Sequence, residues 1–355
     1  MQTANSKQQT ANSKQQTANS KQPIIARLKA WAKSKAFIYY PVHWVLRVLH
    51  WLLRVVREFV LFVRWQRYKH FVRFNRCGLN TTEHRDRRII ASLTSYPARI
   101  NIVPYVIASI LNQTMKPDKI VLWLGTEKFP DKKLPDMFDE VKACGVDIEF
   151  REDLGPHTKY FYAFKEYPED LVITFDDDWI YDSDVIECLY DSYQRKPDCV
   201  HAMRVEEIKF MPDGTMAPCN TFNYNGGIIG HASHRYMASG VSGVLYPPHS
   251  VNDEVFNLEA MKKLSFRNDD IWLRIMGILN DTKTVLVSHR NVPGSGVPGF
   301  MIYGSQEVAL WRSNVTGGEN DVQMKAVLGA YNTWPLASTG KTLIEMMRED
   351  SDGVE

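Results

Sequence analysis

The sequence has few cysteines and no arrangement that would pair them. Its five cysteines are an odd number and include no Cys-x-x-Cys pair, so neither a disulfide framework nor a zinc site is expected, and the compartment is predicted to be reducing. No Gly-x-Gly-x-x-Gly or Gly-x-x-x-x-Gly-Lys-Ser/Thr motif follows a predicted strand. This absence removes support for dinucleotide-dependent redox enzymes and for P-loop enzymes.

Long uncharged apolar runs are missing as well. No run reaches the ~18 residues that a membrane-spanning helix needs. Arginines interrupt the apolar stretches near the N-terminus, and no small-residue cleavage site follows them. A secretory signal peptide is therefore not expected.

Acidic residues are almost absent from residues 23–77, where Glu58 stands among many Lys and Arg. Because the whole chain has a net charge of only +2, the remainder must be acidic. Between residues 43 and 57, His and Arg recur on one helical face, and Trp and Phe lie elsewhere around the helix. The pattern predicts that residues 24–75 lie on an anionic membrane surface. The alternative is an amphipathic helix packed on protein, and nucleic acid is a poorer match because apolar residues outnumber basic ones.

The chain divides into four predicted regions. Residues 1–22 are disordered heptapeptide repeats, in which Gln-Thr-Ala-Asn-Ser-Lys-Gln occurs three times without an apolar face. Residues 23–77 are the basic amphipathic helical region, residues 78–340 form the globular domain, and residues 341–355 are an acidic tail.

The repeats also carry a hypothesis about expression. A seven-base DNA unit returns to frame after seven codons, and CAAACAG would encode this heptapeptide. Slippage of such a tract would switch expression on and off, as in phase-variable bacterial surface genes. A longer in-frame duplication is the alternative, and the codon sequence of the gene distinguishes the two.

The globular domain alternates predicted strands with predicted helices. This alternation predicts an α/β fold with a mostly parallel sheet flanked by helices. The expected strands are 88–93, 119–124, 146–150, 171–175 and 284–289, and the expected helices between the early strands are 103–113, 134–144 and 160–166.

The chain is organised around the predicted buried strand 171–175, which ends directly in Asp176, Asp177 and Asp178. In open α/β sheets, ligands bind at the carboxyl ends of the strands. Three adjacent carboxylates repel one another, and a hard divalent cation such as Mg²⁺ or Mn²⁺ relieves that repulsion while sharing oxygen ligands with substrate phosphates. The alternative is an acidic turn that caps the next helix.

Two later segments also contain candidate residues for a functional site. Residues 240–248 form a glycine-punctuated loop that suits close backbone approach to a ligand. Asn268 is predicted to cap a helix whose first turn contains Asp269 and Asp270, and the alternative for this pair is simple complementation of the helix dipole, which is common. The late strand ends in His289.

Taken in order, five segments resemble the nucleotide-sugar glycosyltransferases of GT-A fold, a Rossmann-like fold. The likeness is greatest to GT2-like bacterial enzymes that build lipopolysaccharide and other surface polysaccharides. The segments are 92–99, 111–114, 174–178, 240–248 and 268–272, within residues 88–330.

The resemblance implies roles for the residues on the donor side. Asp176 to Asp178 would be the DXD-type motif, with Asp176 and Asp178 holding the ribose and a Mn²⁺ or Mg²⁺ that bridges the donor diphosphate. The other donor-binding residues implied in this way are Thr94, Arg99, Asp153, Lys159, Asp176 and Asp177. For Lys159 an ordinary surface lysine is the equal alternative. His289 would be a third metal ligand, for which a structural histidine is the alternative.

The acidic pair matches the family's general base, with Asp270 favoured over Asp269. The implied reaction is a single inverting displacement at the anomeric carbon. Ser242 departs from the family's Gly-Val-Gly-Gly loop, which leaves the contacts to the donor sugar open. The absence of Gln-x-x-Arg-Trp makes processive polymer synthases a worse match than enzymes that add one sugar.

The predicted function is thus a metal-dependent transferase that moves a hexose, with UDP-hexoses favoured as donors, to a lipid-linked saccharide at the cytoplasmic side of the bacterial inner membrane, where the enzyme is peripheral. A metal-dependent nucleotidyltransferase or phosphotransferase is the first alternative, because such enzymes also end a parallel strand in acids. A non-catalytic membrane-bound scaffold is the second.

Overall fold

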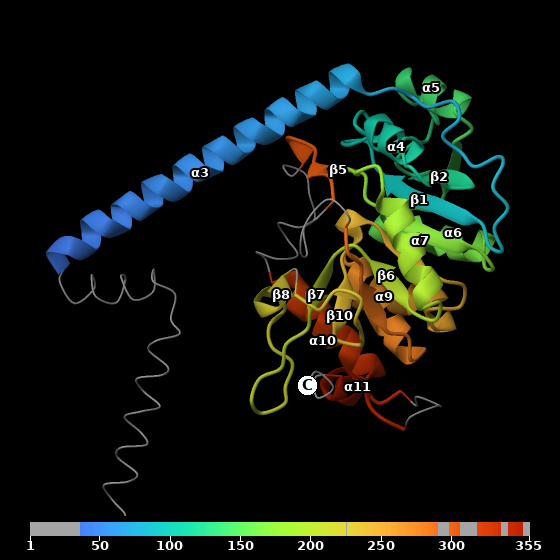
Figure 1. Ribbon diagram of the computed structural model, residues 1–355. Helices are drawn as coiled ribbons and strands as arrows, with labels where there is room; N and C mark the ends of the chain where they lie inside the picture. The colour runs from blue at the N-terminus through green and yellow to red at the C-terminus, as the bar shows by residue number, and fades with distance from the viewer. Residues whose placement is uncertain (1–35, 225, 290–297, 306–317, 335–339, 351–355) are drawn as a thin grey trace, which may run out of the picture. The chain divides into compact units, whose positions relative to one another are not determined.

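The computed structural model describes residues 36–224, 226–289, 298–305, 318–334 and 340–350 (Figure 1). The chain divides into two compact units, Met1–Arg64 and Trp65–Glu355. The repeats that we expected to be disordered, residues 1–22, lie outside the described residues.

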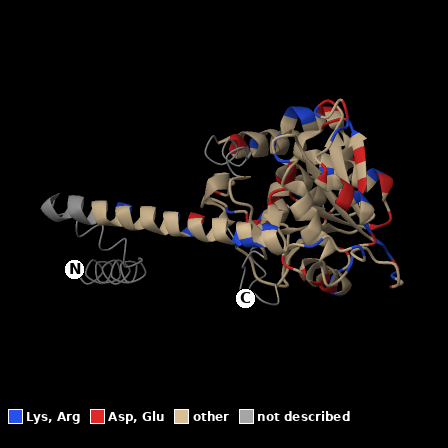
Figure 2. Cartoon of the chain, turned by 90° about the horizontal axis from the view of Figure 1, so that it is seen from above, with Lys and Arg blue, Asp and Glu red and all other residues tan. Residues whose placement is uncertain are grey.

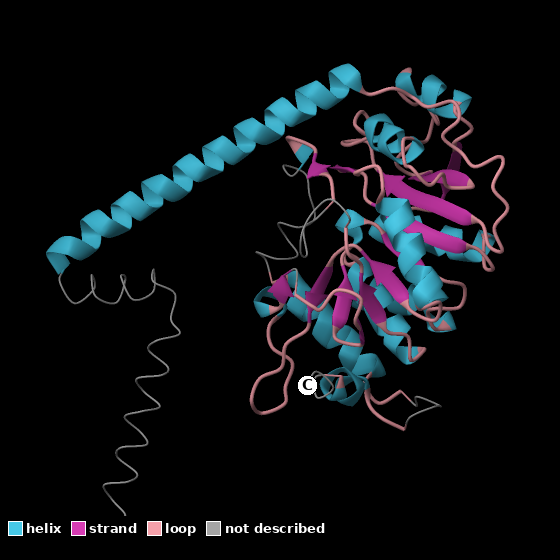
Figure 3. Ribbon diagram, viewed as in Figure 1, coloured by secondary structure: helices cyan, strands magenta, loops and turns pink. Residues whose placement is uncertain are grey.

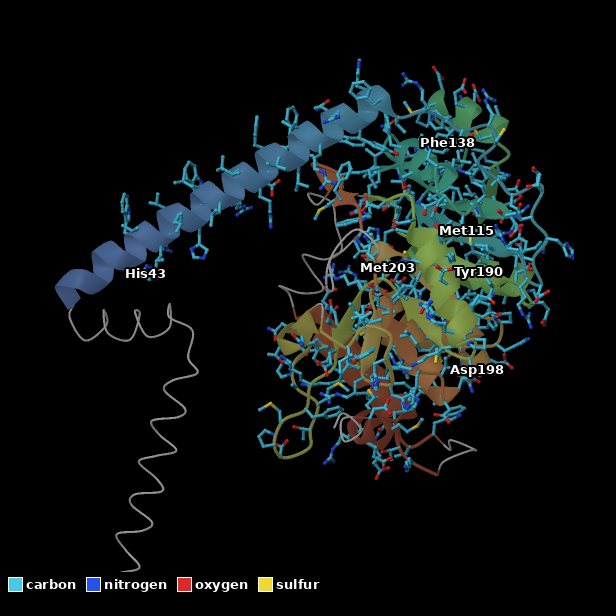
Figure 4. All side chains as sticks on the ribbon, viewed as in Figure 1. His43, Met115, Phe138, Tyr190, Asp198 and Met203 are labelled. Carbon is cyan, nitrogen blue, oxygen red and sulfur yellow. The ribbon has the colours of Figure 1, made fainter. Side chains whose placement is uncertain are left out.

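Helix α3, Ala36–Phe71, falls within the region predicted to be a basic amphipathic helix. Lys and Arg recur along it (Figure 2), and His43 lies near its beginning (Figure 4). Large apolar side chains are exposed on it, among them Trp44, Trp51, Leu53 and Phe59. None of the helices within the described residues combines the length and apolar character needed to cross a bilayer.

The second unit is built around a sheet that has eight strands within the described residues (Figure 3). Their order is β3-β2-β1-β4-β11-β6-β12-β9. The strands are β1 (Ile89–Ser95), β2 (Lys119–Gly125), β3 (Asp147–Arg151), β4 (Leu171–Phe175), β6 (Val200–Ala202), β9 (Ala232–Ser233), β11 (Val244–Tyr246) and β12 (Thr284–Leu286).

The half of the sheet from β3 to β4 is parallel throughout. Strand β1 pairs with β4 so that Ile89 lies opposite Leu171 and Leu93 opposite Phe175. Every residue of β4 is buried, as expected for an apolar strand covered on both faces. The ends of β1 and β4 therefore lie side by side, which brings their following loops together.

Helices pack against the sheet, α6 against β1, β2 and β4, and α7 against β6 and β11. The helices of this unit are α4 (Val103–Leu111), α5 (Met137–Ala143), α6 (Thr158–Glu166), α7 (Val185–Arg195), α8 (Leu258–Leu264), α9 (Asp269–Leu279), α10 (Glu319–Tyr331) and α11 (Leu343–Glu349). The expected α/β class, with a mostly parallel sheet flanked by helices, is confirmed.

Strand β11 has a place in the large sheet that was not expected from the sequence. Residues 244–246, which lie inside the predicted loop 240–248, form β11 and run antiparallel between β4 and β6. The β-branched and aromatic residues of Val244–Tyr246 suit a strand. The strand was not predicted because its run of three residues between glycine and proline is short, and because its pairing depends on residues distant in the sequence.

Two small sheets lie beside the large one. Strands β10 (Tyr236–Ala238), β7 (Val205–Glu207) and β8 (Asn223–Tyr224) form an antiparallel sheet, and β13 (Phe300–Met301) pairs with β5 (Trp179–Ile180). Short 3₁₀ helices are η1 (Gly155–His157), η2 (Cys219–Thr221), η3 (Gly240–Ser242) and η4 (Asp253–Phe256). Strand β5 is important because it follows Asp178 directly.

The end of the chain differs from the expected acidic tail. Within residues 341–355, Leu343–Glu349 forms α11 and buries Leu343, Met346 and Met347. Thr342 and Glu345 make a capping box at its beginning. The apolar residues of this segment are spaced by three and four, which is typical of a packed helix. The helix was not predicted because acidic residues dominate the composition of the segment.

Candidate functional site

The three aspartates lie at the carboxyl end of β4, and Arg99 holds two of them. Arg99 Nη1 lies 2.6 Å from Asp177 Oδ1, and its Nη2 lies 2.9 Å from Asp178 Oδ2. The Ser95 hydroxyl, at the end of β1, donates to Asp177 Oδ2 at 2.6 Å. Because β1 and β4 are parallel neighbours, their ends deliver the cation and the acids to the same place.

Burial makes these carboxylates costly to ionise. It raises the pKa of Asp178 to about 7 and also raises the pKa of Asp177, while Arg99 opposes both shifts. For Arg99, burial would lower the pKa, but the two carboxylates outweigh it and raise the value. An additional cation at this place would stabilise the charged form of Asp178.

Lys159, near the beginning of α6, is a buried bridge between two acidic segments. Its Nζ lies 2.6 Å from Asp176 Oδ1 and 2.9 Å from Asp269 Oδ2. Burial would lower the pKa of Lys159, but the charges of Asp176, Asp269 and Asp270 outweigh it and hold the pKa well above its ordinary value. The structure therefore removes the alternative of an ordinary surface lysine, because the side chain is 7% exposed.

Asp269 and Asp270 occupy the first turn of α9, as the sequence predicted. The Asn268 side chain caps this helix by accepting a hydrogen bond from the amide of Ile271 at 2.9 Å. Asp270 Oδ1 accepts a hydrogen bond from the amide of Gly240 at 3.1 Å. Burial, followed by the charge of Asp269, raises the pKa of Asp270 well above its usual range. A carboxylate in such surroundings has a strong tendency to take up a proton.

Gly240 lies close to the lysine and the two acidic segments. A Cβ on Gly240 would lie 2.9 Å from Lys159 Nζ, 3.2 Å from Asp176 Oδ1 and 3.4 Å from Asp270 Oδ1. The absence of a side chain therefore lets the backbone touch both acidic segments. The close approach of this loop to a ligand stays a prediction.

A buried histidine links α6 to the segment before α9. His157 Nε2 lies 2.8 Å from the carbonyl of Ser265, and its Nδ1 lies 2.9 Å from the Tyr160 hydroxyl. A carbonyl can only accept, so Nε2 carries the hydrogen and Nδ1 accepts. Burial lowers the pKa of His157 to about 4, which keeps the ring neutral. Because Ser265 also donates to the carbonyl of Asn268 at 2.8 Å, His157 helps to place the cap of α9.

The other predicted donor-side residues line the ends of β1 and β3. Thr94 donates to the carbonyl of Trp123 at 2.9 Å, and Asp153 lies 2.6 Å from Lys128 Nζ. Both Arg99 and Lys128 lie over the ring of Tyr96, at 5.7 and 5.8 Å from its centroid. Tyr96 thus connects Arg99, at the aspartates, to Lys128 and Asp153 along one edge of the sheet.

His289 lies in a different pair. Its Nε2 lies 2.7 Å from Asp184 Oδ1 and 3.9 Å from Asp182 Oδ2. The structure therefore engages this nitrogen with the segment before α7, and the role of third metal ligand stays a prediction. Across the described residues, no group of three or more His, Cys, Asp or Glu side chains is placed to hold a metal ion.

Sequence reasoning missed several residues of this site. Ser95 and Tyr96 stand within the quoted segment 92–99, so their position after a strand was a usable signal. Arg204, just after β6, is buried; burial lowers its pKa, and the charges of Glu206, then Asp270 and Asp176, oppose the shift. For Lys128 the sequence offered no signal.

A hollow of about 500 Å³ lies away from the carboxylates, between the turn 210–214 and α11. Its polar lining includes Arg235, Glu345 and Arg348. Arg235 donates to the carbonyl of Ile208, and the Glu345 side chain accepts from Thr342. Arg235 and Glu345 are thus engaged in hydrogen bonds of the fold, and the acidic cluster remains the candidate site.

Replacing Gly240 by alanine is expected to lower the free energy of unfolding by about 1–3 kcal/mol, since the new Cβ would press on a lysine that two carboxylates hold in place. Gly329→Ala in α10 is the matched control, because its Cβ would meet no atom within 4 Å. Urea unfolding of both variants measures the difference. Equal stabilities would show that Lys159 can move aside.

No family model matches the sequence, and the search of curated proteins finds no match. Among solved structures, the chain is similar to a 4-diphosphocytidyl-2C-methyl-D-erythritol synthase, with 10% identity over 63% of this chain and 96% of that chain and a TM-score of 0.38. It is also similar to the glucosyl-3-phosphoglycerate synthase from Mycobacterium tuberculosis in complex with Mn²⁺, UDP and glucosyl-3-phosphoglycerate, with 12% identity over 68% of this chain and 87% of that chain and a TM-score of 0.34. At these identities and scores the likeness carries no argument about activity.

Proposed function

We propose that this chain is a metal-dependent, inverting glycosyltransferase of GT-A fold that adds one sugar from a nucleotide-sugar donor to a lipid-linked saccharide. One observation carries the proposal. Two acidic segments far apart in the sequence meet at Lys159, whose Nζ contacts Asp176 at the end of β4 and Asp269 at the beginning of α9. A transferase needs a group that binds the donor and a group that activates the acceptor, and the two must lie side by side.

The donor side is built from the ends of β1, β3 and β4. Asp176 and Asp178 would hold the ribose and a Mn²⁺ or Mg²⁺, and their oxygens are the ligand type that such hard cations take. Burial is the first cause of the raised pKa of Asp178, and a cation bound beside this carboxylate would favour its charged form. When bound, the metal neutralises charge on the departing diphosphate. Arg99 would orient Asp177 and Asp178 through its ion pairs with both.

The nucleotide would lie along the edge marked by Thr94, Tyr96, Lys128 and Asp153. The ring of Tyr96, which has the cations of Arg99 and Lys128 near it, would offer an aromatic surface close to the diphosphate position. Lys128 offers a positive charge that Asp153 holds in place. Among sugar nucleotides, UDP-hexoses are the donors that the family resemblance favours.

The acceptor side is the first turn of α9. Asp270 would take the proton from the acceptor hydroxyl as its oxygen bonds to the anomeric carbon, and the electron pair of the broken carbon–oxygen bond leaves with the nucleoside diphosphate. Its raised pKa favours this proton transfer, and Lys159 keeps neighbouring Asp269 paired. General base catalysis of this kind contributes about 10²–10⁴-fold. Attack from the side opposite the leaving group inverts the configuration.

The enzyme is expected to leak donor to water, so its reaction can be tested without the acceptor. With Mn²⁺, wild-type protein should release a nucleoside diphosphate from one member of a nucleotide-sugar panel. Asp178→Asn, which keeps the shape but removes a charge, should lower the rate about a hundredfold or more. Chelation should abolish the release.

Asp131→Asn is the matched control, because Asp131 is exposed, and it should hydrolyse donor at the wild-type rate. Absence of metal-dependent turnover or binding for every sugar nucleotide would refute the transferase. Turnover of a nucleoside triphosphate instead would identify a nucleotidyltransferase or phosphotransferase.

Replacing His157 is expected to lower kcat, because its hydrogen bond to Ser265 helps to place the cap of α9 and therefore Asp270. His157→Phe should reduce kcat by about 10- to 100-fold. His157→Gln, which keeps a donor near the Ser265 carbonyl, should lose less. Steady-state donor hydrolysis measures both effects.

The chain holds a matched control in His201. This ring is also fully buried and neutral, with its Nδ1 2.8 Å from Ser192 Oγ and its Nε2 2.9 Å from the carbonyl of Lys196. His201→Phe should lower stability by a similar ~1–3 kcal/mol without lowering kcat. An equal loss of kcat in both phenylalanine variants would count against the role of His157.

We expect α3 to be the part of the chain that binds the membrane surface. Exposed Trp44, Trp51 and Phe59, together with arginines along the same helix, suit insertion into a bilayer interface with anionic lipids. A helix held in this way would keep the enzyme at the cytoplasmic side of the inner membrane, on the surface to which a lipid-linked acceptor is confined.

Reversing charge on α3 is expected to weaken membrane binding without touching the site. The double variant Arg47→Glu, Arg54→Glu should bind vesicles containing anionic lipid at least tenfold more weakly, since each basic residue near such a surface contributes about 1 kcal/mol. Arg47→Lys, Arg54→Lys is the charge-matched control. Co-sedimentation measures binding, and donor hydrolysis in solution should be equal in both. Indistinguishable vesicle binding by the two doubles would remove the membrane role of this face.

A further inference from the structure

The last turns of α3 pack within the compact unit that holds the acidic cluster. Trp65 is buried, and its ring makes an edge-to-face contact with Tyr105 of α4 at 5.0 Å. Tyr68 donates from its hydroxyl to the carbonyl of Tyr105 at 3.0 Å and meets the ring of Phe300 edge-on at 6.0 Å. Phe71, three residues on, has an exposed side chain (63%). The end of the helix is thus joined to the body through specific side chains.

A first connection runs from Tyr68 to Asp178 through β13. Phe300 in β13 pairs with Ile180 in β5, the strand that follows Asp178 (Figure 1). Two residues after Phe300, the amide of Ile302 donates to the carbonyl of Asp178 at 2.9 Å. Tyr68 therefore contacts Phe300 in β13, and the residue just after β13 is hydrogen-bonded to Asp178.

The same segment also reaches the cation of the site. The carbonyl of Ser305 accepts a hydrogen bond from Arg99 Nη2 at 3.2 Å, and the carbonyl of Pro298 accepts one from Trp179 Nε1 at 2.8 Å. Residues 298–305 are therefore hydrogen-bonded to both partners of the Arg99–Asp178 ion pair.

A second connection runs from Tyr68 to Asp176 through α4. Burial raises the pKa of the Tyr68 hydroxyl, and a hydrogen bond with Ser109 opposes that shift. The Ser109 hydroxyl accepts from the amide of Tyr181 at 3.3 Å. The hydroxyl of Tyr181 in turn accepts from the amide of Asp176 at 2.7 Å. Ser109, which contacts Tyr68, therefore holds the Tyr181 end of the loop 176–181, and Tyr181 in turn holds the Asp176 end.

We propose that Tyr68 is a positioning residue for the loop 176–181, which couples the last turns of α3, residues 65–71, to the donor side of the site through the ring contact of Tyr68 with Phe300 and its hydroxyl contacts on α4. The proposal deepens the proposed function, on which it rests for its consequence in nucleotide binding.

The variants that test the coupling are made in the full-length chain. Tyr68→Ala removes both connections, and Tyr68→Phe keeps the ring contact but removes the hydroxyl. Phe71→Ala removes a ring of similar size from the same helical end, where it is exposed. His201→Phe lowers the stability of the body at a distance from the loop.

Hydrogen exchange of the amides in residues 176–181 is the first measurement, and it does not depend on any activity. Exchange should be at least tenfold faster in Tyr68→Ala than in wild type, intermediate in Tyr68→Phe and unchanged in Phe71→Ala. If exchange in this loop rises no more in Tyr68→Ala than in His201→Phe, the coupling is overturned and Tyr68 contributes only to overall stability.

The affinity for UDP in the presence of Mn²⁺ is the second measurement. It should fall about tenfold in Tyr68→Ala, by less in Tyr68→Phe, and not at all in Phe71→Ala or His201→Phe. Wild-type protein that binds no nucleotide with any metal would refute the proposed function, while the exchange data would still decide the coupling. Unchanged affinity in Tyr68→Ala, with wild-type protein binding normally, would overturn the effect on the donor side.

Discussion

The ion pairs of Lys159 are the interaction on which the rest of the site depends. Five carboxylates approach one another between the end of β4 and the beginning of α9, and most are buried. Without a cation among them, burial and mutual repulsion would favour protonation of several of these groups. Lys159 lies between Asp176 and Asp269 and so permits the two acidic segments to come together. This single amine thus joins the acidic end of β4 to the acidic first turn of α9.

The arrangement around this lysine is held from several directions. Arg99 pairs with Asp177 and Asp178, Gly240 brings its backbone to Asp270, and His157 ties α6 to the segment that precedes α9. Each contact joins elements that are separated in the chain. A site of this type is precise because its supporting groups are buried and their own hydrogen bonds leave them few alternative positions. The braces at Tyr68 extend the same logic to the end of α3.

The sequence predicted well those features that depend on neighbours along the chain. The apolar run 171–175 followed by aspartates forms the strand and loop that were expected, and Asn268 caps the helix that bears Asp269 and Asp270. For Lys159, by contrast, the sequence left a donor-site cation and a surface lysine equally open, because its burial depends on two distant carboxylates. The helix at residues 343–349 was not predicted because acidic residues are in local excess there, although its apolar spacing indicates a packed helix.

The sequence by itself determined the α/β alternation, the basic and apolar character of α3, and the places where acids follow a strand or begin a helix. These are properties of periodicity, capping and composition, which act over a few residues. Only the tertiary structure decided that β11 enters the sheet antiparallel between β4 and β6, that His289 lies against Asp184, and that Lys159 joins the two acidic segments. Such partnerships arise from packing between segments that are remote in the chain, and no local pattern encodes which remote segment will be the partner.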